Sequence, residues 1–355
     1  MFLGNRLRKK FFKAFLFTLV GGLVLVGCAL LVLRSAIRQP TVPAHAAQPF
    51  VSDIHFRPPG NRPAYDTVEP HPEDAYISIS APENGWTRRA DFFTVLLFGY
   101  DAGRNTDTLM VAAFDAANQQ AYIVSIPRDT KVDVQRNIRR VNSAYAVGRQ
   151  GGGGHTGGVE QLRREVQTLI GFIPDFYICV EENAFRRIVD AVGGVYIDVP
   201  FHMYYTDPAQ NLRINIPAGR QRLDGHQALH FVRYRYGNDP ARTISDRRRM
   251  QNQQQLIAAM LEELRAPRTI LRVPELINTY RDHVRTDLTL NEMLWFAEQF
   301  LTGNVTLHTY SYPTTSLRLT HWYEIPNPEE ALALINRTLN PFTRDLTPDN
   351  LQLTT

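Results

Sequence analysis

The sequence predicts an α/β domain with a mixed central sheet. From about residue 76 onward, apolar runs typical of strands alternate with segments whose apolar residues recur at helical spacing. This alternation is typical of a sheet covered by helices on both faces. Two strand-like runs, 108–115 and 121–129, are joined by a short polar connection. We expect these two runs to pair as an antiparallel hairpin, and an antiparallel pair among crossover-connected strands makes the sheet mixed.

The individual elements follow from the same patterns, with several helices closed by glycine. Strands are expected at 92–101, 108–115, 121–129, 175–180, 195–199 and 304–313. Helices are expected at 159–171, 182–194, 224–232, 247–264, 290–301 and 327–339. Between these elements, residues 200–223 are expected to be irregular. The glycine-rich run 148–158 lacks the Gly-Lys-Ser/Thr ending of a nucleotide-binding loop, so we interpret it as a flexible loop.

The N-terminal part predicts a membrane anchor. Residues 14–33 carry no charge, and a helix of this length spans roughly 30 Å. Five cations precede this run, so residues 1–13 are expected to be a cytoplasmic stub and the C-terminal part to lie outside the cytoplasm. A cleaved signal peptide and a lipoprotein processed at Cys28 are the alternatives. Both fit less well, because the apolar run is long and continues to Leu33.

Proline content and charge set further bounds on organisation and function. Nine of the 22 prolines fall between Pro40 and Pro82, so residues 34–75 are expected to be an extended extracytoplasmic linker. The following domain is expected to cover 76–342, with its core at 90–265 and a tail at 343–355.

Beyond residue 33 the chain holds 34 basic and 35 acidic groups, which argues against a nucleic-acid-binding surface. Cys28 and Cys179 are too few for a disulfide framework or a four-cysteine zinc site.

Arginine supplies almost every cation of the predicted domain. Lysine occurs only at positions 9, 10, 13 and 131, whereas eight arginines lie between residues 220 and 249. The planar guanidinium group suits phosphate and carboxylate oxygens. Arg233 and Arg235 lie two positions apart, so an extended backbone would direct both side chains to one anion. The alternative is an ordinary solvated surface in which these arginines bind no ligand.

Two more short motifs place charged side chains after buried strands. Asp101 and Asp107 lie in the loop after the first strand, where α/β sheets often bind ligands. Together they suit a hard cation such as Mg²⁺, although aspartate also caps loops without any metal. Arg128 follows Pro127 directly after the third strand, so we expect its backbone to be held rigidly at a sheet edge. A purely structural role for Arg128 and Asp129 is equally consistent with this motif.

Taken in order, the motifs resemble the LytR-CpsA-Psr family of membrane-anchored cell-wall ligases. The matching stretches are FTVLLFGYD, NTDTLMV, VSIPRDT, RRVNSAYAVG, VDAVGGVYIDVP, LDGHQALHFVRYR and Asp246-x-x-Arg249-x-x-x-Gln253. They cover roughly residues 90–265, and a weaker match extends to about residue 340. The resemblance implies a three-layer α/β/α fold preceded by one transmembrane helix. It also implies a membrane-bound phosphotransferase that moves a glycopolymer from an undecaprenyl-pyrophosphate carrier to a peptidoglycan acceptor.

The same resemblance implies roles for individual residues. Asp101 and Asp107 match carboxylates that bind Mg²⁺ (or Mn²⁺). The arginines that match a pyrophosphate-binding set are Arg128, Arg233, Arg235 and Arg249, and Gln253 matches a polar pocket residue. Asp107, Arg128 and Arg249 are therefore the expected catalytic residues. Four arginines gathered at one place would repel one another unless a bound anion offset the repulsion. We therefore expect all four to line one cavity that binds a diphosphate.

Several alternatives stay open. The general base is either Asp107 or Asp246, and the motifs do not choose between them. Arg104 is separated by Asn105 from the Thr106-Asp107-Thr108 triplet, whereas the family often has an arginine directly before the corresponding triplet. The competing functions are a non-catalytic envelope protein that binds anionic polymer, a prenyl-pyrophosphate hydrolase and a membrane-tethered transcriptional attenuator. Only thirteen residues precede the predicted span, which argues against the attenuator.

Overall fold

The computed structural model describes residues 38–47, 49, 86–100, 105–208, 212–266, 269, 272–319 and 321–353. The chain divides into two compact units. The smaller unit, Met1–Thr41 with Leu288–Thr302, contains helix α8 (Leu290–Thr302). The larger unit is Val42–Asp287 with Gly303–Thr355, and it is the subject of the rest of this section. The predicted stub 1–13 and span 14–33 lie outside the described residues, and none of the helices that are described is both long and apolar enough to cross a membrane.

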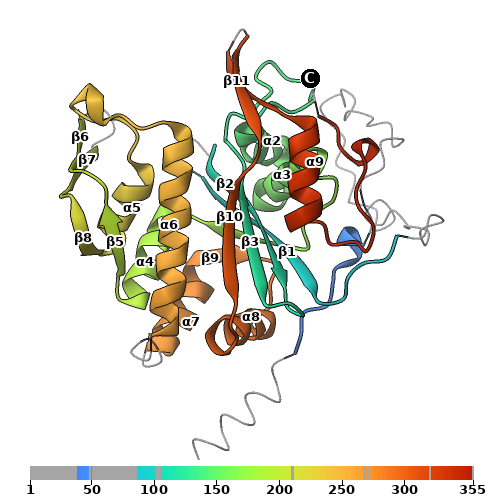
Figure 1. Ribbon diagram of the computed structural model, residues 1–355, viewed down its shortest axis with the longest axis horizontal. Coiled ribbons are helices and arrows are strands. Elements are labelled where there is room, and N and C mark those ends of the chain that lie inside the picture. Colours follow the sequence, from blue (N-terminus) through green and yellow to red (C-terminus); the bar gives the residue numbers. More distant parts are fainter. Residues whose placement is uncertain are drawn as a thin grey trace, which may run out of the picture. The chain divides into compact units, whose positions relative to one another are not determined.

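Within the described residues, six strands of the larger unit form one mixed sheet in the order β10-β3-β2-β1-β4-β9 (Figure 1). The strands are β1 (Phe92–Tyr100), β2 (Thr106–Asp115), β3 (Gln120–Ser125), β4 (Phe176–Val180), β9 (Val284–Thr286) and β10 (Thr306–Ser311). β1 pairs antiparallel with β2 and parallel with β4. β2 and β3 are antiparallel neighbours, so the predicted hairpin and the mixed character of the sheet are confirmed.

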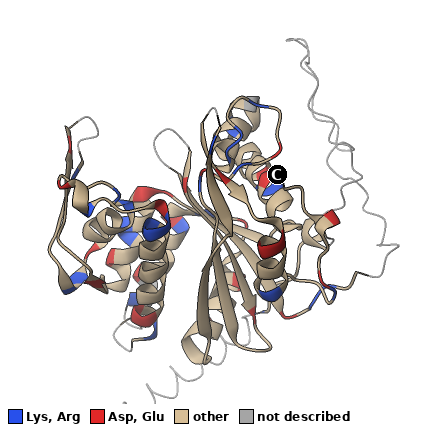
Figure 2. Cartoon of the chain, turned by 45° about the horizontal axis from the view of Figure 1, so that its top comes forward, with Lys and Arg blue, Asp and Glu red and all other residues tan. Residues whose placement is uncertain are grey.

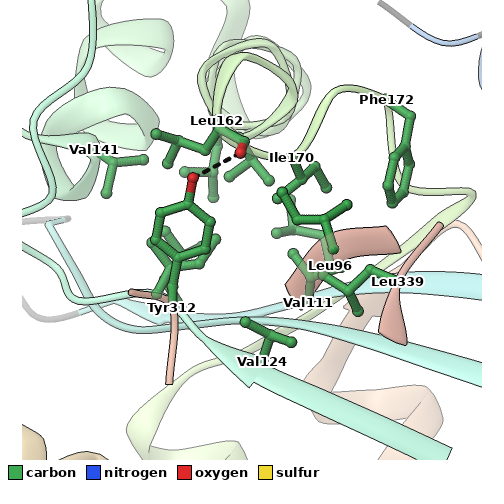
Figure 3. Close-up of a cluster of buried hydrophobic side chains, with 14 of the residues drawn as sticks. Leu96, Val111, Val124, Val141, Leu162, Ile170, Phe172, Tyr312 and Leu339 are labelled. Atoms are coloured by element: carbon green, nitrogen blue, oxygen red, sulfur yellow. Dashed lines mark hydrogen bonds between the residues drawn. The ribbon is translucent and has the colours of Figure 1, made fainter. Parts of the chain in front are cut away.

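One face of the sheet is covered by α2 (Ala144–Gly148), α3 (Gly154–Ile170) and α9 (Pro328–Thr338) (Figure 1). Side chains alternate between the two faces of a strand, so Leu96 and Phe98 point to this core with Val111 of β2. Figure 3 shows Leu162 and Ile170 of α3 over the sheet, together with Leu339. The buried Tyr312 hydroxyl donates to the Leu169 carbonyl at 2.8 Å, which satisfies a polar group inside this core.

The other face carries α4 (Glu182–Val192), α5 (Gly225–Arg233), α6 (Asp246–Arg265) and α7 (Val273–His283) (Figure 1). Two small antiparallel sheets extend this layer and give it an apolar core of its own. They are β5 (Val195–Val199) with β8 (Gly219–Leu223), and β6 (Met203–Asp207) with β7 (Leu212–Ile216). Gly193 ends α4 in the left-handed conformation, at φ 94°, which is the stop that the sequence predicted.

Two expectations about local structure are corrected. The run 148–158 is a kinked join between two helices rather than a flexible loop: a π-helical turn covers Arg149–Gly153, Gly152 adopts a left-handed φ of 86° within it, and α3 begins at Gly154. Close packing requires glycine there, because a Cβ on Gly148 would lie 2.2 Å from the Gly157 carbonyl oxygen. Residues 200–223 contain β6, β7 and β8 rather than an irregular stretch. The sequence patterns also missed the hairpin of β11 (Thr314–Arg318) and β12 (Trp322–Pro326).

The structure also shows how the expected linker and tail meet the larger unit. Ala46, within the expected linker, is fully buried, and its carbonyl accepts a 2.9 Å hydrogen bond from Arg88. Pro49 forms an isolated β-bridge with Phe172. At the other end, Leu346 packs into the first core at 3% exposure. Ala46 and Pro49 of the expected linker and Leu346 of the expected tail therefore pack onto the larger unit.

Candidate active site

A cavity of about 530 Å³ lies between the sheet and helices α4, α5 and α6. Most of its lining is apolar. Leu97, Met110 and Ile178 project from neighbouring strands on the face opposite the first core. The helices contribute Phe185, Ile188, Leu229, Val232, Leu256, Ile257 and Met260. The lining also includes a charged group formed by Asp107, Arg128, Glu182, Arg233, Arg235 and Arg249. The cavity therefore suits an amphiphilic ligand with an apolar tail and an anionic head.

Asp107 reaches this cavity because of an irregularity in the β1–β2 ladder. Gly99 pairs with Thr108, whereas Tyr100 pairs with Thr106, so Asp107 is the extra residue of a bulge. A bulge turns a side chain away from the regular alternation and is common beside active sites. The Asp107 side chain is 42% exposed and accepts a 2.7 Å hydrogen bond from Arg128. Asp101, its expected partner, lies outside the described residues.

Arg128 is held in a tight turn at the end of the sheet, as the position after Pro127 predicted. The Thr130 N–H donates to the Pro127 carbonyl at 3.0 Å, and the Thr130 hydroxyl donates to the same oxygen at 2.6 Å. The Asn142 N–H donates to the Arg128 carbonyl at 3.2 Å. These backbone bonds fix the position from which the Arg128 side chain reaches the cavity.

Helix α6 presents Asp246, Arg249 and Gln253 at intervals of three and four residues, which is the spacing of one helix face. The Ser245 hydroxyl caps the helix by accepting from the Arg248 N–H at 3.2 Å. Gln253 donates from Nε2 to the Thr108 hydroxyl at 3.1 Å, which joins the helix to β2 beside the bulge. Asp246, Arg249 and Gln253 therefore lie on one face of α6, and this face is directed at the sheet.

Arg233 and Arg235 lie at the C-terminal end of α5 and line the same cavity. Asp224 and Gln227 form a capping box at the start of that helix, which fixes its register. Arg233 is the last residue of the helix, and Tyr234 leaves the helical conformation at ψ 125°. The Ile244 N–H then donates to the Arg235 carbonyl at 2.8 Å. The four arginines predicted from separate motifs thus meet at one cavity.

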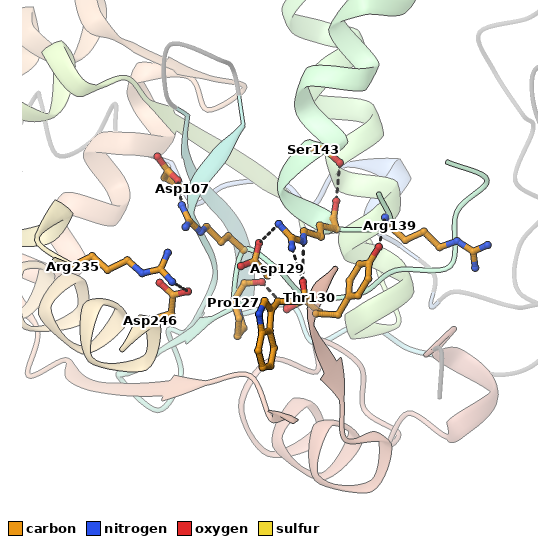
Figure 4. Close-up of polar contacts among 12 residues, drawn as sticks. Asp107, Pro127, Asp129, Thr130, Arg139, Ser143, Arg235 and Asp246 are labelled. Atoms are coloured by element: carbon orange, nitrogen blue, oxygen red, sulfur yellow. Dashed lines mark hydrogen bonds and ion pairs between the residues drawn. The ribbon is translucent and has the colours of Figure 1, made fainter. Parts of the chain in front are cut away.

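Each of these arginines already has a carboxylate partner. Arg233 pairs with Glu182 at 2.7 Å. Asp246 pairs with Arg235 at 3.5 Å and with Arg249 at 3.2 Å. Figure 4 shows the Arg235–Asp246 pair at the left of the view, below Asp107. Figure 2 shows basic and acidic residues intermingled around the start of α6. These carboxylates therefore offset most of the repulsion among the arginines. The clustering of the arginines is thus a weaker argument for a bound anion than the sequence suggested.

Two arginines nevertheless retain unused hydrogen-bonding capacity. Nε of Arg128 and Nε of Arg249 are buried and have no partner among the described residues. Burial, and then the nearby Arg128 and Arg235, lower the pKa of Arg249, against the opposing effect of Asp246. Burial alone would lower the pKa of Arg128, but the Asp107 hydrogen bond and nearby carboxylates raise it overall. Both guanidinium groups stay charged at neutral pH, since arginine is not deprotonated in proteins at that pH.

The sequence motifs did not predict the carboxylates that pair with the arginines of the site. Glu182 begins α4, and its proximity to Arg233 depends on the packing of α4 against α5. Asp246 was considered only as a base, whereas it bridges two arginines of the site. Tyr100, also in the cavity lining, donates to Glu181 at 2.5 Å. Burial and this bond raise the pKa of Tyr100, which keeps the hydroxyl protonated.

The donor chemistry of the site fits a Mg²⁺ ion held chiefly by its substrate. In the described part of the chain, no group of three or more His, Cys, Asp or Glu side chains is arranged as a metal centre. Mg²⁺ commonly takes only one or two protein carboxylates and completes its shell with phosphate oxygens and water. Asp107 meets this requirement, because Arg128 engages one carboxylate oxygen and the side chain is partly exposed at the cavity.

The fold agrees with the comparisons with known proteins. The model of the LytR_cpsA_psr family matches residues 65–338, and the chain belongs to that family. Regulatory protein MsrR of Staphylococcus aureus (strain COL) is 27% identical over 212 residues, which cover 58% of this chain and 59% of MsrR. The chain thus spans about three-fifths of that relative's length.

Two further comparisons concern Bacillus subtilis. The polyisoprenyl-teichoic acid–peptidoglycan teichoic acid transferase TagV of strain 168 is 26% identical over 214 residues, 57% of this chain and 51% of TagV. The crystal structure of B. subtilis TagV superposes with a TM-score of 0.56 at 23% identity, covering 70% of this chain and 96% of that one. At this identity the structural likeness establishes the shared fold.

Proposed function

We propose that the protein is a phosphotransferase that moves a glycopolymer from an undecaprenyl-pyrophosphate carrier to peptidoglycan. The observation that carries this proposal is the cavity whose apolar lining leads to four arginines. Its volume of about 530 Å³ falls within the range of ligand pockets, about 300–1,000 Å³. A C55 prenyl chain would therefore place its first units in the cavity and leave the rest outside. A soluble anion alone would have no use for the apolar part.

The reaction is the attack of an acceptor hydroxyl on the phosphorus attached to the glycan. The new bond joins the acceptor oxygen to phosphorus, the bond to the bridging oxygen breaks, and prenyl phosphate leaves with the electron pair. Phosphoryl transfer depends mainly on positioning and on neutralising charge. Arg128 and Arg249, whose Nε atoms are buried without a partner among the described residues, are placed to stabilise the leaving phosphate, and Arg233 and Arg235 to bind the diphosphate.

Diphosphate binding would compete with the carboxylates that now pair with the arginines. Asp246, released from Arg235 or Arg249, would become free to accept the proton of the acceptor hydroxyl. Asp107 is the other candidate base and the proposed ligand of Mg²⁺. When bound, Mg²⁺ would polarise the phosphate oxygens. Because the pyrophosphate bond supplies the free energy, the reaction needs no nucleotide.

The proposed location follows from the same substrates. The uncharged run 14–33 would anchor the chain in the membrane with the short N-terminal stub in the cytoplasm. The domain would then act outside the cytoplasm, where peptidoglycan is assembled. TagV carries a name that states teichoic acid transfer, whereas MsrR is named a regulator. The chemistry of the cavity favours the transferase for this chain.

The direct test uses the full-length protein in detergent with a prenyl-pyrophosphate glycan and peptidoglycan. We expect Mg²⁺-dependent release of prenyl phosphate together with glycan bound to peptidoglycan. Release without attachment would identify a hydrolase, and binding without release would identify a non-catalytic envelope protein. Arg249→Ala should abolish both products, whereas the matched variant Arg248→Ala should not, because Arg248 is exposed and its side chain donates to Gln251 of the same helix.

A further inference from the structure

A second, polar pocket of about 1030 Å³ adjoins the candidate active site. The two share Asp107, Arg128 and Arg235 in their linings, so these side chains form a common wall. The first cavity is lined mainly by apolar residues, whereas the second is lined mainly by polar ones. A ligand of the polar pocket would therefore meet a ligand of the apolar cavity at Arg128 and Asp107.

The outer wall of this pocket is the β11–β12 hairpin, and backbone bonds fix it to the segment that carries Arg128. The Glu324 N–H donates to the Asp129 carbonyl at 3.0 Å, and the Lys131 N–H donates to the Glu324 carbonyl at 2.9 Å. Arg140 adds a side-chain link, since its guanidinium group pairs with Asp129 at 3.2 Å and donates to the Trp322 carbonyl. Figure 4 shows Asp129 next to Pro127 in this network.

The chemistry of the pocket suits a neutral, hydroxyl-rich ligand. Its lining includes side chains that can both donate and accept hydrogen bonds, such as Asn142, Ser245 and Thr315. The charged groups of the lining balance, because it holds four arginines and four carboxylates, and Asp129 pairs with Arg140. The carboxylate of Glu324 accepts from the Thr314 hydroxyl at 2.7 Å and from the Ser316 hydroxyl at 2.5 Å. The pocket thus offers many hydrogen bonds with little net charge, which favours a sugar over a polyanion.

Trp322 adds a feature that hydrogen bonding alone does not explain. It lines the pocket, yet 58% of its surface is exposed to solvent. An exposed large aromatic side chain is a common anchor for a binding partner. The indole face carries negative charge density, which attracts the weakly positive C–H groups on one face of a pyranose ring. The guanidinium carbon of Arg318 lies over one face of the indole, 5.9 Å from the ring centroid, and the ladder of β11 with β12 places Arg318 opposite Trp322. A sugar ring would therefore stack on the other face.

We infer that the polar pocket is the acceptor subsite, where a peptidoglycan glycan chain binds with one sugar ring stacked on Trp322. This inference rests on the proposed transferase function and adds the side from which the acceptor arrives. The acceptor hydroxyl would reach the phosphorus across the common wall, opposite the prenyl tail. Trp322 is then a positioning residue, because it holds the sugar without touching the reacting atoms.

The first test is steady-state transfer by full-length protein, with donor and acceptor varied separately. Trp322→Ala should raise KM for uncross-linked peptidoglycan glycan about 10-fold, equivalent to about 1.4 kcal/mol, and leave KM for the donor unchanged. Trp322→Phe should recover most of this loss. Leu317→Ala is the matched control, because Leu317 is 46% exposed on the same hairpin but does not line the pocket. A rise in donor KM instead, or an equal effect of Leu317→Ala, would overturn the acceptor assignment.

The second test separates this inference from the proposed function. Glycan fragments should quench tryptophan fluorescence of the wild type, and Trp322→Phe should remove that response. Arg233→Ala alters only the apolar cavity, so it should lose transfer but keep glycan binding. Wild type that binds glycan without transferring polymer would refute the enzyme and retain the subsite. A Trp322-dependent response to lipid vesicles but not to glycan would assign the hairpin to the membrane and refute the subsite.

Discussion

Arg128 donates a 2.7 Å hydrogen bond to Asp107, although the two residues belong to different segments at the ends of β2 and β3. The bulge directs one side chain to this meeting point, and the turn after Pro127 directs the other. Antiparallel pairing of β2 with β3 places the start of β2 beside the end of β3. The contact therefore depends on the ladder, and local sequence alone does not determine it.

Replacing Asp107 should separate metal binding from folding. Asp107→Asn keeps a hydrogen-bond acceptor for Arg128 but removes the negative charge that Mg²⁺ requires. We expect transfer to fall by about 100-fold, a change in activation free energy of about 2.7 kcal/mol, and to lose its response to Mg²⁺. The measurement is turnover against Mg²⁺ concentration, with Asp133→Asn as an exposed control. Wild-type metal response in the Asp107 variant would disprove the ligand assignment.

Arg249 should tolerate lysine poorly. Lysine keeps the positive charge but loses the planar donors that bind two phosphate oxygens at once. We expect Arg249→Lys to lower turnover by on the order of 100-fold, as loss of a transition-state donor does. Arg248→Lys, one position earlier and exposed, should stay near wild type. Equal turnover of the two variants would show that Arg249 contributes charge alone.

The apolar part of the cavity should select for prenyl length. Ile257→Glu places a carboxylate in this lining, and burying it against a prenyl chain is costly. We expect KM to rise at least 10-fold for long-chain donors and much less for donors with one or two prenyl units. Ile138→Glu is the control, because Ile138 is 43% exposed and lies outside the lining. The same increase for short and long donors would argue against the cavity as the tail site.

The buried pair of Arg88 and Asp175 predicts a large stability effect. Asp175 is fully buried, Arg88 is nearly so, and burial raises the pKa of Asp175 to about 6 despite the arginine. Arg88→Met leaves this carboxyl without its cation and should lower the free energy of unfolding by about 3–5 kcal/mol. Arg89→Met breaks the more exposed pair with Asp115 and should cost about 1 kcal/mol or less. Denaturant unfolding measures both, and equal losses would contradict this ranking.

His230 should make stability fall in mild acid. Burial, and then the neighbouring His226 and Arg233, lower the pKa of His230 to about 4. The unfolded chain then binds the proton more readily than the folded one between about pH 6.5 and pH 4, so stability is lost as pH falls through this window. We expect wild type to lose on the order of 2 kcal/mol more than His230→Phe between pH 7 and pH 4.5. His226→Phe, at an exposed position, should behave more like wild type.

The elements that the sequence predicted are those with a strong local signal. β1, β2 and β4 are buried on both faces and so read as continuous apolar runs. Gly171 and Gly193 mark helix ends because both adopt the left-handed conformation. β6 and β8 were not predicted, because they are short strands of two-stranded sheets and their exposed faces carry charged and polar residues. Glycines in the run 148–158 suggested flexibility, whereas they permit close helix packing.

The arginines of the candidate site could be predicted one by one from the sequence, but their ion pairs with carboxylates could not. Four arginines could be named from motifs, since each motif matches its family position separately. The carboxylate partners could not, because the contacts of Arg233 with Glu182 and of Arg235 with Asp246 depend on how helices pack. The polar pocket was missed for the same reason: β12 joins the Arg128 segment across almost 200 residues of sequence.

The common wall of the two pockets has a thermodynamic consequence. Arg128 donates a hydrogen bond to Asp107, and both side chains line both pockets. A donor that draws Arg128 away from Asp107 changes the surface offered to the acceptor. By linkage, the acceptor then changes the affinity for the donor by the same factor. The common wall would thus couple the binding of the two proposed substrates, so that each changes the affinity for the other before any bond is made.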